Sequence, residues 1–347
     1  MPVLRGWNVS RLSRRLMLAA MLCGGLAPSP LHARQPPEPM ETPAWFTETF
    51  LDFREDVRDA AKEGKRLLVY FGQDGCPYCR ELIRTNFTQP RIVAKTRRHF
   101  VALAINIWGD REVTWSDGRS LSEKEFARHL KIQFTPTILL LDEQGAVAAR
   151  LNGYYPPHRF EAALDYAAGK LEKKQAFAEY MKKAVKEAAS DRLHDEPFFI
   201  TPPYRLERRP DGKPLLALFE TRHCAGCDEL HREGFRRPEV ASLLGRFDVA
   251  RFALGDASPL TTPDGRRSSA AAWARELKVN YTPTLVFFDA SGREVFRVEA
   301  YLRPFHLASS LEYVAGGGYR SEPSFQRFIQ ARAEKMRARG EAVDLWK

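Results

Sequence analysis

Two pairs of cysteines, each enclosing two residues, are the groups in this sequence best suited to chemistry: Cys76 with Cys79, and Cys224 with Cys227. A thiolate attacks a disulfide, and two thiols three positions apart can form and break a disulfide between themselves. A disulfide that closes so short a loop stabilises a fold little, so these pairs are not typical structural cross-links. A zinc ribbon would bring two such pairs within about 20 residues of each other, but these pairs lie in different halves of the chain. The spacing therefore favours redox chemistry.

The surroundings of each pair predict which cysteine reacts first. An Asp-Gly turn signal precedes Cys76 and a proline follows it, so a helix is expected over 76–86. The free N–H groups and the dipole at a helix N-terminus stabilise a thiolate, which makes Cys76 the expected nucleophile. Cys79, nearly one turn later, would then attack the mixed disulfide and release the product. By the same geometry Cys224 attacks and Cys227 resolves.

The two pairs belong to two copies of one longer pattern. An apolar run precedes each pair, and a Thr-Pro dipeptide follows each at nearly the same spacing. The matching segments are 67–71 with 215–219, 117–119 with 264–266, and Thr135-Pro136 with Thr282-Pro283. The chain therefore contains one domain twice.

Each copy predicts the same order of secondary-structure elements. The run 65–71 has no polar alternation, which suits a strand buried on both faces. Ser122 and Glu125 form a capping box that opens a later helix. The elements predicted for the first copy are strands at 65–71, 100–107, 137–141 and 146–151, and helices at 76–86, 122–131 and 159–168. Strands that alternate with helices indicate an α/β protein.

This pattern resembles the thioredoxin fold over residues 45–169 and again over 198–316. The shared features are a strand, C-x-x-C at the start of a helix, and Thr-Pro before the next-to-last strand. Through its segment 70–80 and the insertion 108–121, the first copy is similar to the periplasmic thioredoxin-related proteins associated with bacterial sulfur oxidation. The resemblance implies two tandem thioredoxin-like domains, each a mixed central sheet flanked by helices.

The resemblance also implies a role for the two Thr-Pro dipeptides. In the family this proline is cis and faces the cysteines, so that the threonine backbone can pair with an extended substrate segment. The predicted substrate-binding residues are therefore Thr135, Pro136, Thr282 and Pro283. A proline that merely opens a strand is the alternative.

The sequence departs from the family pattern around both pairs. Thioredoxins keep a buried acid six residues before the first cysteine, but Tyr70 and Leu218 occupy those positions here. The first pair encloses Pro-Tyr as glutaredoxins do, yet the glutathione-binding Gly-Gly-Asp segment is not evident. Protein thiols are thus the expected substrates. The second pair encloses Ala-Gly without a proline, so its redox potential is expected to differ.

A metal site at the second pair is an alternative that the sequence leaves open. His223 precedes Cys224, and His231 follows Cys227 by about one helical turn. Thiolates with imidazole suit copper(I) or zinc. The first copy has neither histidine, and isolated surface histidines explain the pattern as well. We therefore predict no metal and no other cofactor.

The rest of the sequence predicts how the domains are connected. The predicted parts are a signal peptide at 1–33, a first domain at 41–170, a charged helical linker at 171–196, a second domain at 197–318 and a basic C-terminal helix at 319–347. An amphipathic helix over 45–61 should lead into the first domain, whereas 198–214 is Pro-rich and extended. A solvated helix is expected over 172–189, and a tail helix over 324–339 that packs back on the protein.

The N-terminus predicts export. Arginines precede a short apolar run that ends near a small residue, Ala33, which is typical of a secretory signal peptide. The run is too short to cross a bilayer of ~30 Å as a helix, although an uncleaved anchor is the alternative. The mature protein is expected to begin near Arg34 and to be periplasmic.

Charge and motifs narrow the function. The chain carries 54 Lys and Arg against 44 Asp and Glu, a net charge of +10, but the basic residues are largely dispersed among acids and no nucleic-acid partner is expected. The sequence predicts an exported thiol:disulfide oxidoreductase that reduces or exchanges disulfides of protein clients. Since no nucleotide-binding motif is present, its electrons should come from a membrane thiol carrier. The alternative is a client-binding or metal-thiolate module without turnover.

Overall fold

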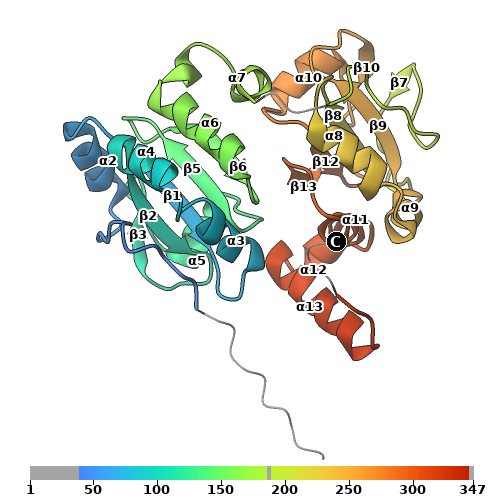
Figure 1. Cartoon of the computed structure of the whole chain (residues 1–347). Helices are drawn as coiled ribbons and strands as arrows, with labels where there is room; N and C mark the ends of the chain where they lie inside the picture. The colour runs from blue at the N-terminus through green and yellow to red at the C-terminus, as the bar shows by residue number, and fades with distance from the viewer. Residues whose placement is uncertain (1–38, 186–188, 344–347) are drawn as a thin grey trace, which may run out of the picture. The chain divides into compact units, whose positions relative to one another are not determined.

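The computed structural model describes residues 39–185 and 189–343 (Figure 1). The predicted signal peptide, 1–33, lies outside the described residues. Within the described ranges, no helix has the length and apolar character needed to cross a membrane.

The first half is built on a mixed sheet of four strands in the order β2-β1-β5-β6. The strands are β1 (Arg66–Gly72), β2 (Phe100–Asn106), β5 (Thr137–Leu141) and β6 (Val147–Asn152). The central strand β1 pairs in parallel with β2 and antiparallel with β5. Every residue of β1 is buried, as its uninterrupted apolar sequence predicts.

The second half repeats this sheet in the order β13-β12-β8-β9. Its strands are β8 (Leu215–Glu220), β9 (Asp248–Ala253), β12 (Thr284–Phe288) and β13 (Glu294–Val298). The central strand β8 is parallel to β9 and antiparallel to β12, as β1 is to its neighbours. The two predicted copies therefore share one topology.

Helices cover both sheets (Figure 1). In the first half they are α2 (Phe53–Lys62), α3 (Pro77–Thr85), α4 (Pro90–His99), α5 (Glu123–His129) and α6 (Pro157–Ala168). In the second they are α8 (Ala225–Glu229), a π-helical turn η3 (Leu230–Gly234), α9 (Pro238–Leu244), α10 (Ala270–Glu276) and α11 (Pro304–Ala315). The predicted capping box of Ser122 and Glu125 is present at the start of α5. The helices α4 and α9 were not predicted from the sequence.

A small hairpin precedes α5 and α10 in their respective halves. Strands β3 (Glu112–Thr114) and β4 (Ser120–Ser122) form the first hairpin, and β10 (Pro259–Thr261) and β11 (Arg267–Ser269) form the second, to which β7 (Tyr204–Arg205) adds a strand. The segment 108–121, interpreted as an insertion, is thus a feature of both halves.

The two faces of β1 contact different layers. Leu67, Val69 and Phe71 belong to a cluster with residues of α2 and α5. Leu68 and Tyr70 instead belong to a cluster that contains both cysteines of the first pair. Alternate residues of a strand point to opposite faces, so the even-numbered face of β1 is the one that carries the cysteine helix.

The predicted leading helix over 45–61 is wrong in its first half. The helix α2 begins only at Phe53, where Asp52 caps it by accepting hydrogen bonds from the N–H groups of Arg54 and Glu55. Leu51 has a positive φ of 57°, which breaks any continuous helix. Phe50, one of the apolar residues within the helix predicted over 45–61, is 100% exposed. The apolar periodicity was genuine only from Phe53 onward.

The connection between the halves also differs from the prediction. Instead of one solvated helix over 172–189, a short 3₁₀ turn η2 (Leu171–Lys173) precedes α7 (Phe177–Ala184). Phe177 is buried and packs edge-on against Tyr166 of α6, so α7 belongs to the packed structure. Residues 197–214 form no helix, as expected. The tail forms α12 (Gly318–Ser321) and α13 (Phe325–Ala338), and Phe325 packs back on Phe296 and Tyr313.

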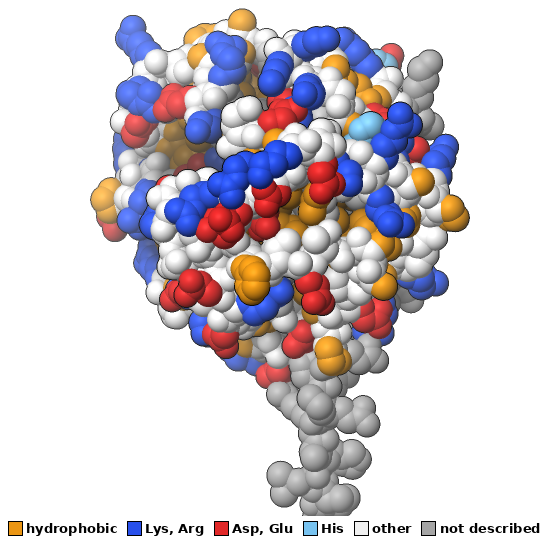
Figure 2. Space-filling model, turned by 90° about the vertical axis from the view of Figure 1, so that its left-hand side faces the viewer, with side chains coloured by type: hydrophobic (Ala, Val, Ile, Leu, Met, Phe, Trp, Pro, Cys, Tyr) orange, Lys and Arg blue, Asp and Glu red, His pale blue; other side chains and the backbone are white. Residues whose placement is uncertain are grey.

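The surface shown in Figure 2 carries interspersed basic and acidic side chains.

Arg66 at the start of β1 is a buried charge that should dominate the stability of the first half. Its side chain is 4% exposed and donates to the Ala167 carbonyl at 2.6 Å, to Glu143 at 2.8 Å and to Glu172 at 2.9 Å. We expect Arg66→Met to lower the free energy of unfolding by about 3 kcal/mol, because two poorly hydrated carboxylates lose the guanidinium, and of the two only Glu143 keeps an ion pair with Lys170. Urea unfolding at pH 7 measures this loss.

The neighbouring Lys65 provides the control. It forms an exposed ion pair with Glu63, so Lys65→Met should cost less than about 1 kcal/mol. The hydrogen bond from Arg66 lowers the pKa of Glu143 to about 2. A lowered folded pKa contributes stability above the unfolded value, and this contribution is lost as the pH falls toward 2. The destabilisation by Arg66→Met should therefore shrink in acid, and an equal loss at pH 7 and pH 3 would contradict this account.

Candidate active sites

The first cysteine pair lies at the start of α3, shortly after the end of β1. Cys76 is the N-cap of α3, with Pro77 at the first helical position, and it forms a disulfide with Cys79 across a Cα–Cα distance of 5.2 Å. The N–H group of Cys79 donates to Cys76 Sγ at 3.1 Å. A backbone N–H aimed at this sulfur would stabilise a thiolate there once the disulfide is reduced. The geometry thus suits Cys76 as the nucleophile.

The Thr135-Pro136 dipeptide lies against the same sulfur. The peptide bond between these residues is cis, and the Thr135 carbonyl oxygen is 3.6 Å from Cys76 Sγ. The structure therefore brings Thr135 next to the cysteines Cys76 and Cys79, as the resemblance implied. A small cavity of about 20 Å³ adjoins both sulfurs and is also lined by Met40, in a segment that no motif singled out.

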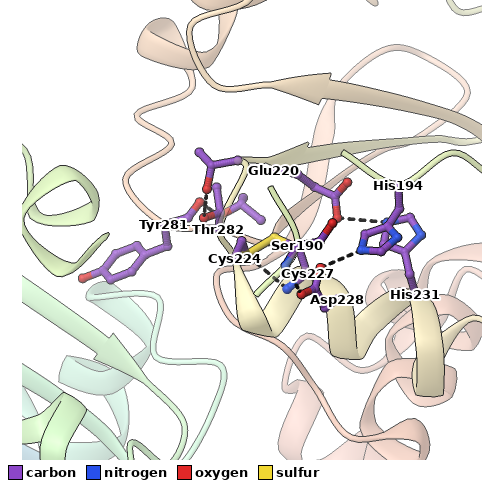
Figure 3. The surroundings of a disulfide bond; sticks show 11 residues. Ser190, His194, Glu220, Cys224, Cys227, Asp228, His231, Tyr281 and Thr282 are labelled. Carbon is purple, nitrogen blue, oxygen red and sulfur yellow. Dashed lines mark hydrogen bonds and ion pairs between the residues drawn. A yellow bond between two sulfur atoms is a disulfide. The ribbon is translucent and has the colours of Figure 1, made fainter. Parts of the chain in front are cut away.

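The second pair repeats this arrangement (Figure 3). Cys224 caps α8 and forms a disulfide with Cys227, again with a Cα–Cα distance of 5.2 Å and a Cys227 N–H to Cys224 Sγ contact of 3.1 Å. The Thr282-Pro283 bond is cis. A Cβ placed on Gly226 would lie 3.2 Å from Pro283 Cδ, so the segment between the cysteines lies directly beside this proline. Both halves therefore present a C-x-x-C disulfide to a Thr-Pro dipeptide.

The residue before each nucleophile has the same unusual backbone. Gly75 precedes Cys76 with φ of 65°, and His223 precedes Cys224 with φ of 57°. Glycine adopts this left-handed conformation at no steric cost, whereas histidine pays a steric cost to adopt it because of its Cβ. His223 is thus held in a strained conformation beside Cys224, where its backbone N–H donates to the Ser190 carbonyl.

A buried ionic cluster behind the second pair was not predicted. The Nδ1 atom of His231 is hydrogen-bonded to Glu196 Oε1 at 3.0 Å, and its Nε2 atom is hydrogen-bonded to Glu220 Oε1 at 3.0 Å. All three side chains are buried, and His194 stacks on His231 at 4.6 Å between ring centroids. Burial lowers the pKa of His231, but the hydrogen bonds and charges of the two glutamates raise it more, so its pKa lies above the usual value. We name Glu196, Glu220 and His231 the buried triad.

The triad bears on two expectations from the sequence. The acid missing at Leu218 is present two residues later, as Glu220 at the end of β8. The sequence feature that could have revealed it is the single acidic residue directly after the apolar run 215–219. The metal alternative paired His231 with Cys227, but both nitrogens of that ring contact carboxylates instead. Within the described residues, no group of three or more His, Cys, Asp or Glu side chains has the arrangement of a metal site.

Comparison of the sequence with known protein families identifies the family of this chain. The sequence matches the model of the thioredoxin-like domain over residues 53–168 and again over 207–315. No curated protein matches the chain in sequence.

Three solved structures with a similar fold each cover less than half of the chain. A thioredoxin-fold protein from Helicobacter pylori is 27% identical, covering 39% of this chain and 90% of its own, with a TM-score of 0.31. The DsbH oxidoreductase is 13% identical, covering 41% and 95%, with a TM-score of 0.28. The periplasmic thioredoxin SoxS from Paracoccus pantotrophus is 21% identical, covering 30% and 98%, with a TM-score of 0.22, which makes it a distant structural neighbour only.

The two family matches coincide with the two mixed sheets, and the predicted α/β fold class is confirmed. The chain belongs to the family of thioredoxin-like domains, and it contains that domain twice.

Proposed function

We propose that this protein is an exported thiol:disulfide oxidoreductase that reduces or exchanges disulfides in other proteins. The observation that carries the proposal is the first site: Cys76 Sγ caps α3, receives the Cys79 N–H at 3.1 Å, and lies 3.6 Å from the Thr135 carbonyl. An extended client segment that pairs with the backbone at Thr135 would bring its disulfide to this sulfur.

The reaction moves two electrons from the cysteine pair to the client. The Cys76 thiolate attacks a client disulfide, so a Cys76–client disulfide forms and one client sulfur leaves as a thiolate. Cys79 loses its proton and attacks Cys76 Sγ, which forms the Cys76–Cys79 disulfide and expels the second client thiolate. Both client thiolates are protonated by solvent. An external dithiol must then reduce the protein again.

The compartment and the electron source are part of the same proposal. The N-terminal arginines and apolar run support export, and the similarity of segment 70–80 to thioredoxin-related proteins of bacterial sulfur oxidation supports a periplasmic role. The expected electron donor there is a membrane thiol carrier. The expected substrates are protein disulfides.

Reduction of insulin by dithiothreitol tests the activity. We expect the purified protein to accelerate the reaction well above dithiothreitol alone, and a Cys76→Ser/Cys79→Ser variant to lose the first pair's share. A folded protein without any acceleration from either pair would leave it a binding module and refute the proposal. Alkylation of the protein in cells, resolved by mass, reports the direction of electron flow.

A further inference from the structure

The second cysteine pair is crossed by the segment of chain that leads into its domain. Ser190 uses both of its backbone groups there: its carbonyl accepts the His223 N–H at 2.8 Å, and its N–H donates to Asp228 Oδ2 at 2.7 Å. His223 directly precedes Cys224, and Asp228 directly follows Cys227. Ser190 therefore contacts both ends of the C-x-x-C motif, and Figure 3 shows it beside the disulfide.

Side chains fasten the same segment farther along. His194 Nε2 lies 2.6 Å from Asp228 Oδ1, and Glu196 Oε1 lies 3.0 Å from His231 Nδ1. One histidine belongs to the segment and the other to η3, so each contacts a carboxylate on the opposite element. Burial raises the pKa of Asp228, but hydrogen bonds from His194 and the Ser190 N–H lower it more, which keeps this carboxylate charged. We name residues 190–196 the strap.

The strap is built so that it can leave the helix. Residues 190–196 form neither helix nor strand, and Arg192 within them is exposed. Just beyond the strap the chain is fixed to the sheet, because Ile200 N–H donates to the carbonyl of Val249 in β9 at 2.8 Å. A segment held mainly by polar contacts opens at a lower free energy than the core does. The strap can therefore swing about residues 199–200 while the sheet stays intact.

The strap takes a backbone group that a client would use. Cys224 is 8% exposed and Cys227 is 2% exposed, so a client must come very close to react. Extended peptides bind through main-chain hydrogen bonds, and the His223 N–H is a main-chain donor directly beside Cys224. The Ser190 carbonyl already accepts from this N–H. The strap thus resembles a bound client at this position.

The first half does not repeat the fastening. Residues 39–41 line the small cavity beside the first pair, so a leading segment also lies near those sulfurs. The cysteine helix there has Arg80 at the position of Asp228 and Ile83 at the position of His231. Neither side chain can make the contact that its counterpart makes with the strap. The paired histidine–carboxylate contacts therefore distinguish the second site from the first.

We propose that the strap is an autoinhibitory segment that closes the second cysteine pair to extended protein clients until it is released. The inference rests on the proposed function, because it assumes that Cys224 reacts with client disulfides. Release breaks the contacts of Ser190, His194 and Glu196 with the cysteine helix and changes no covalent bond. A client segment then pairs with the freed His223 N–H and brings its disulfide to Cys224.

The test compares two probes in a variant that keeps only the second pair, Cys76→Ser/Cys79→Ser. One probe is dithiobis(nitrobenzoate), and the other is a short unstructured peptide whose single cysteine is joined to the same nitrobenzoate thiol. Attack by Cys224 on either probe releases the coloured thiol. We expect His194→Asn to speed the peptide reaction at least about ten-fold at pH 7 and the small reagent less than about two-fold, because losing a charged hydrogen bond frees the strap.

A second variant separates release of the strap from a change in charge. His194→Asn removes a basic group and Asp228→Asn removes an acid, so purely electrostatic effects on the Cys224 thiolate would have opposite signs. Release of the strap instead predicts that both variants speed the peptide reaction. Since both break the same contact, the double variant should exceed the faster single variant by less than about two-fold.

Asp195→Asn is the matched control within the strap. Its carboxylate is 86% exposed and lies 3.7 Å from Arg251, away from the cysteine helix, so both probes should react as in the parent. Limited digestion with trypsin gives an independent readout, because cleavage after Arg192 requires the strap to open. This cleavage should be faster in His194→Asn and Asp228→Asn than in Asp195→Asn. Circular dichroism establishes that each variant is folded.

The outcomes are distinct. Equal peptide rates in the parent, His194→Asn and Asp228→Asn would refute the strap, and so would an equal acceleration of both probes or an acceleration in Asp228→Asn alone. Failure of the reduced parent to react with the small reagent would instead refute disulfide chemistry at the second pair, and the inference with it.

Discussion

A Cys79→Ser variant is expected to accumulate stable mixed disulfides with client proteins through Cys76 and to lose nearly all turnover at the first site. Cys79 lies on the first turn of α3, bonded to Cys76, so in the unaltered protein it would attack from within the same helix. Groups held in this way reach effective concentrations of at least about 10⁵ M. The ratio of this effective concentration to a millimolar external thiol is about 10⁸, so external thiols should release the client many orders of magnitude more slowly.

Trapping is measured on non-reducing gels after acid quench, with the second pair removed by Cys224→Ser/Cys227→Ser. Cys76→Ser is the matched control, because it removes one sulfur from the same helix but leaves no N-terminal nucleophile. That control should trap nothing. Complexes joined through Cys79, or equal trapping by both variants, would reverse the assigned roles of the two cysteines.

Local sequence signals predicted the fold and picked out the two cysteine pairs that form disulfides in the structure. The apolar run of β1, the capping box at Ser122 and the duplicated Thr-Pro dipeptides each report on a structure formed by neighbours in sequence. Prolines at these positions are cis in the thioredoxin resemblance, but the sequence itself left the isomer of Pro136 and Pro283 open, and the structure has both bonds cis.

The features missed were those that depend on partners distant in sequence or on one backbone angle. Glu220 and Glu196 meet His231 across 11 and 35 positions, so no window of sequence shows them as a unit. The helix over 45–61 failed because Leu51 takes a positive φ, which apolar periodicity does not reveal. At the position where the family keeps its buried acid this chain has Leu218, and the acid stands two residues later as Glu220.

The two cysteine pairs are expected to have clearly different midpoint potentials. In the first pair Pro77 presets the start of the helix and the neutral Tyr70 lies behind the sulfurs, whereas the second pair has Ala225 and the buried triad. These surroundings change the free energy of the reduced form relative to the disulfide. For a two-electron couple, a tenfold change in the equilibrium constant is about 30 mV. We expect at least that separation at pH 7.

Redox titration with each pair removed in turn measures the two midpoints. The variant His223→Gly removes the imidazole and keeps the left-handed backbone, because glycine adopts a φ of 57° without strain and Gly75 has a similar φ of 65° in the first half. If a charged His223 side chain stabilises the Cys224 thiolate, this variant should shift only the second midpoint. A gap that persists in His223→Gly would be due to the triad and the segment between the cysteines. Coincident midpoints would contradict the prediction and remove any driving force for electrons to pass from one half to the other.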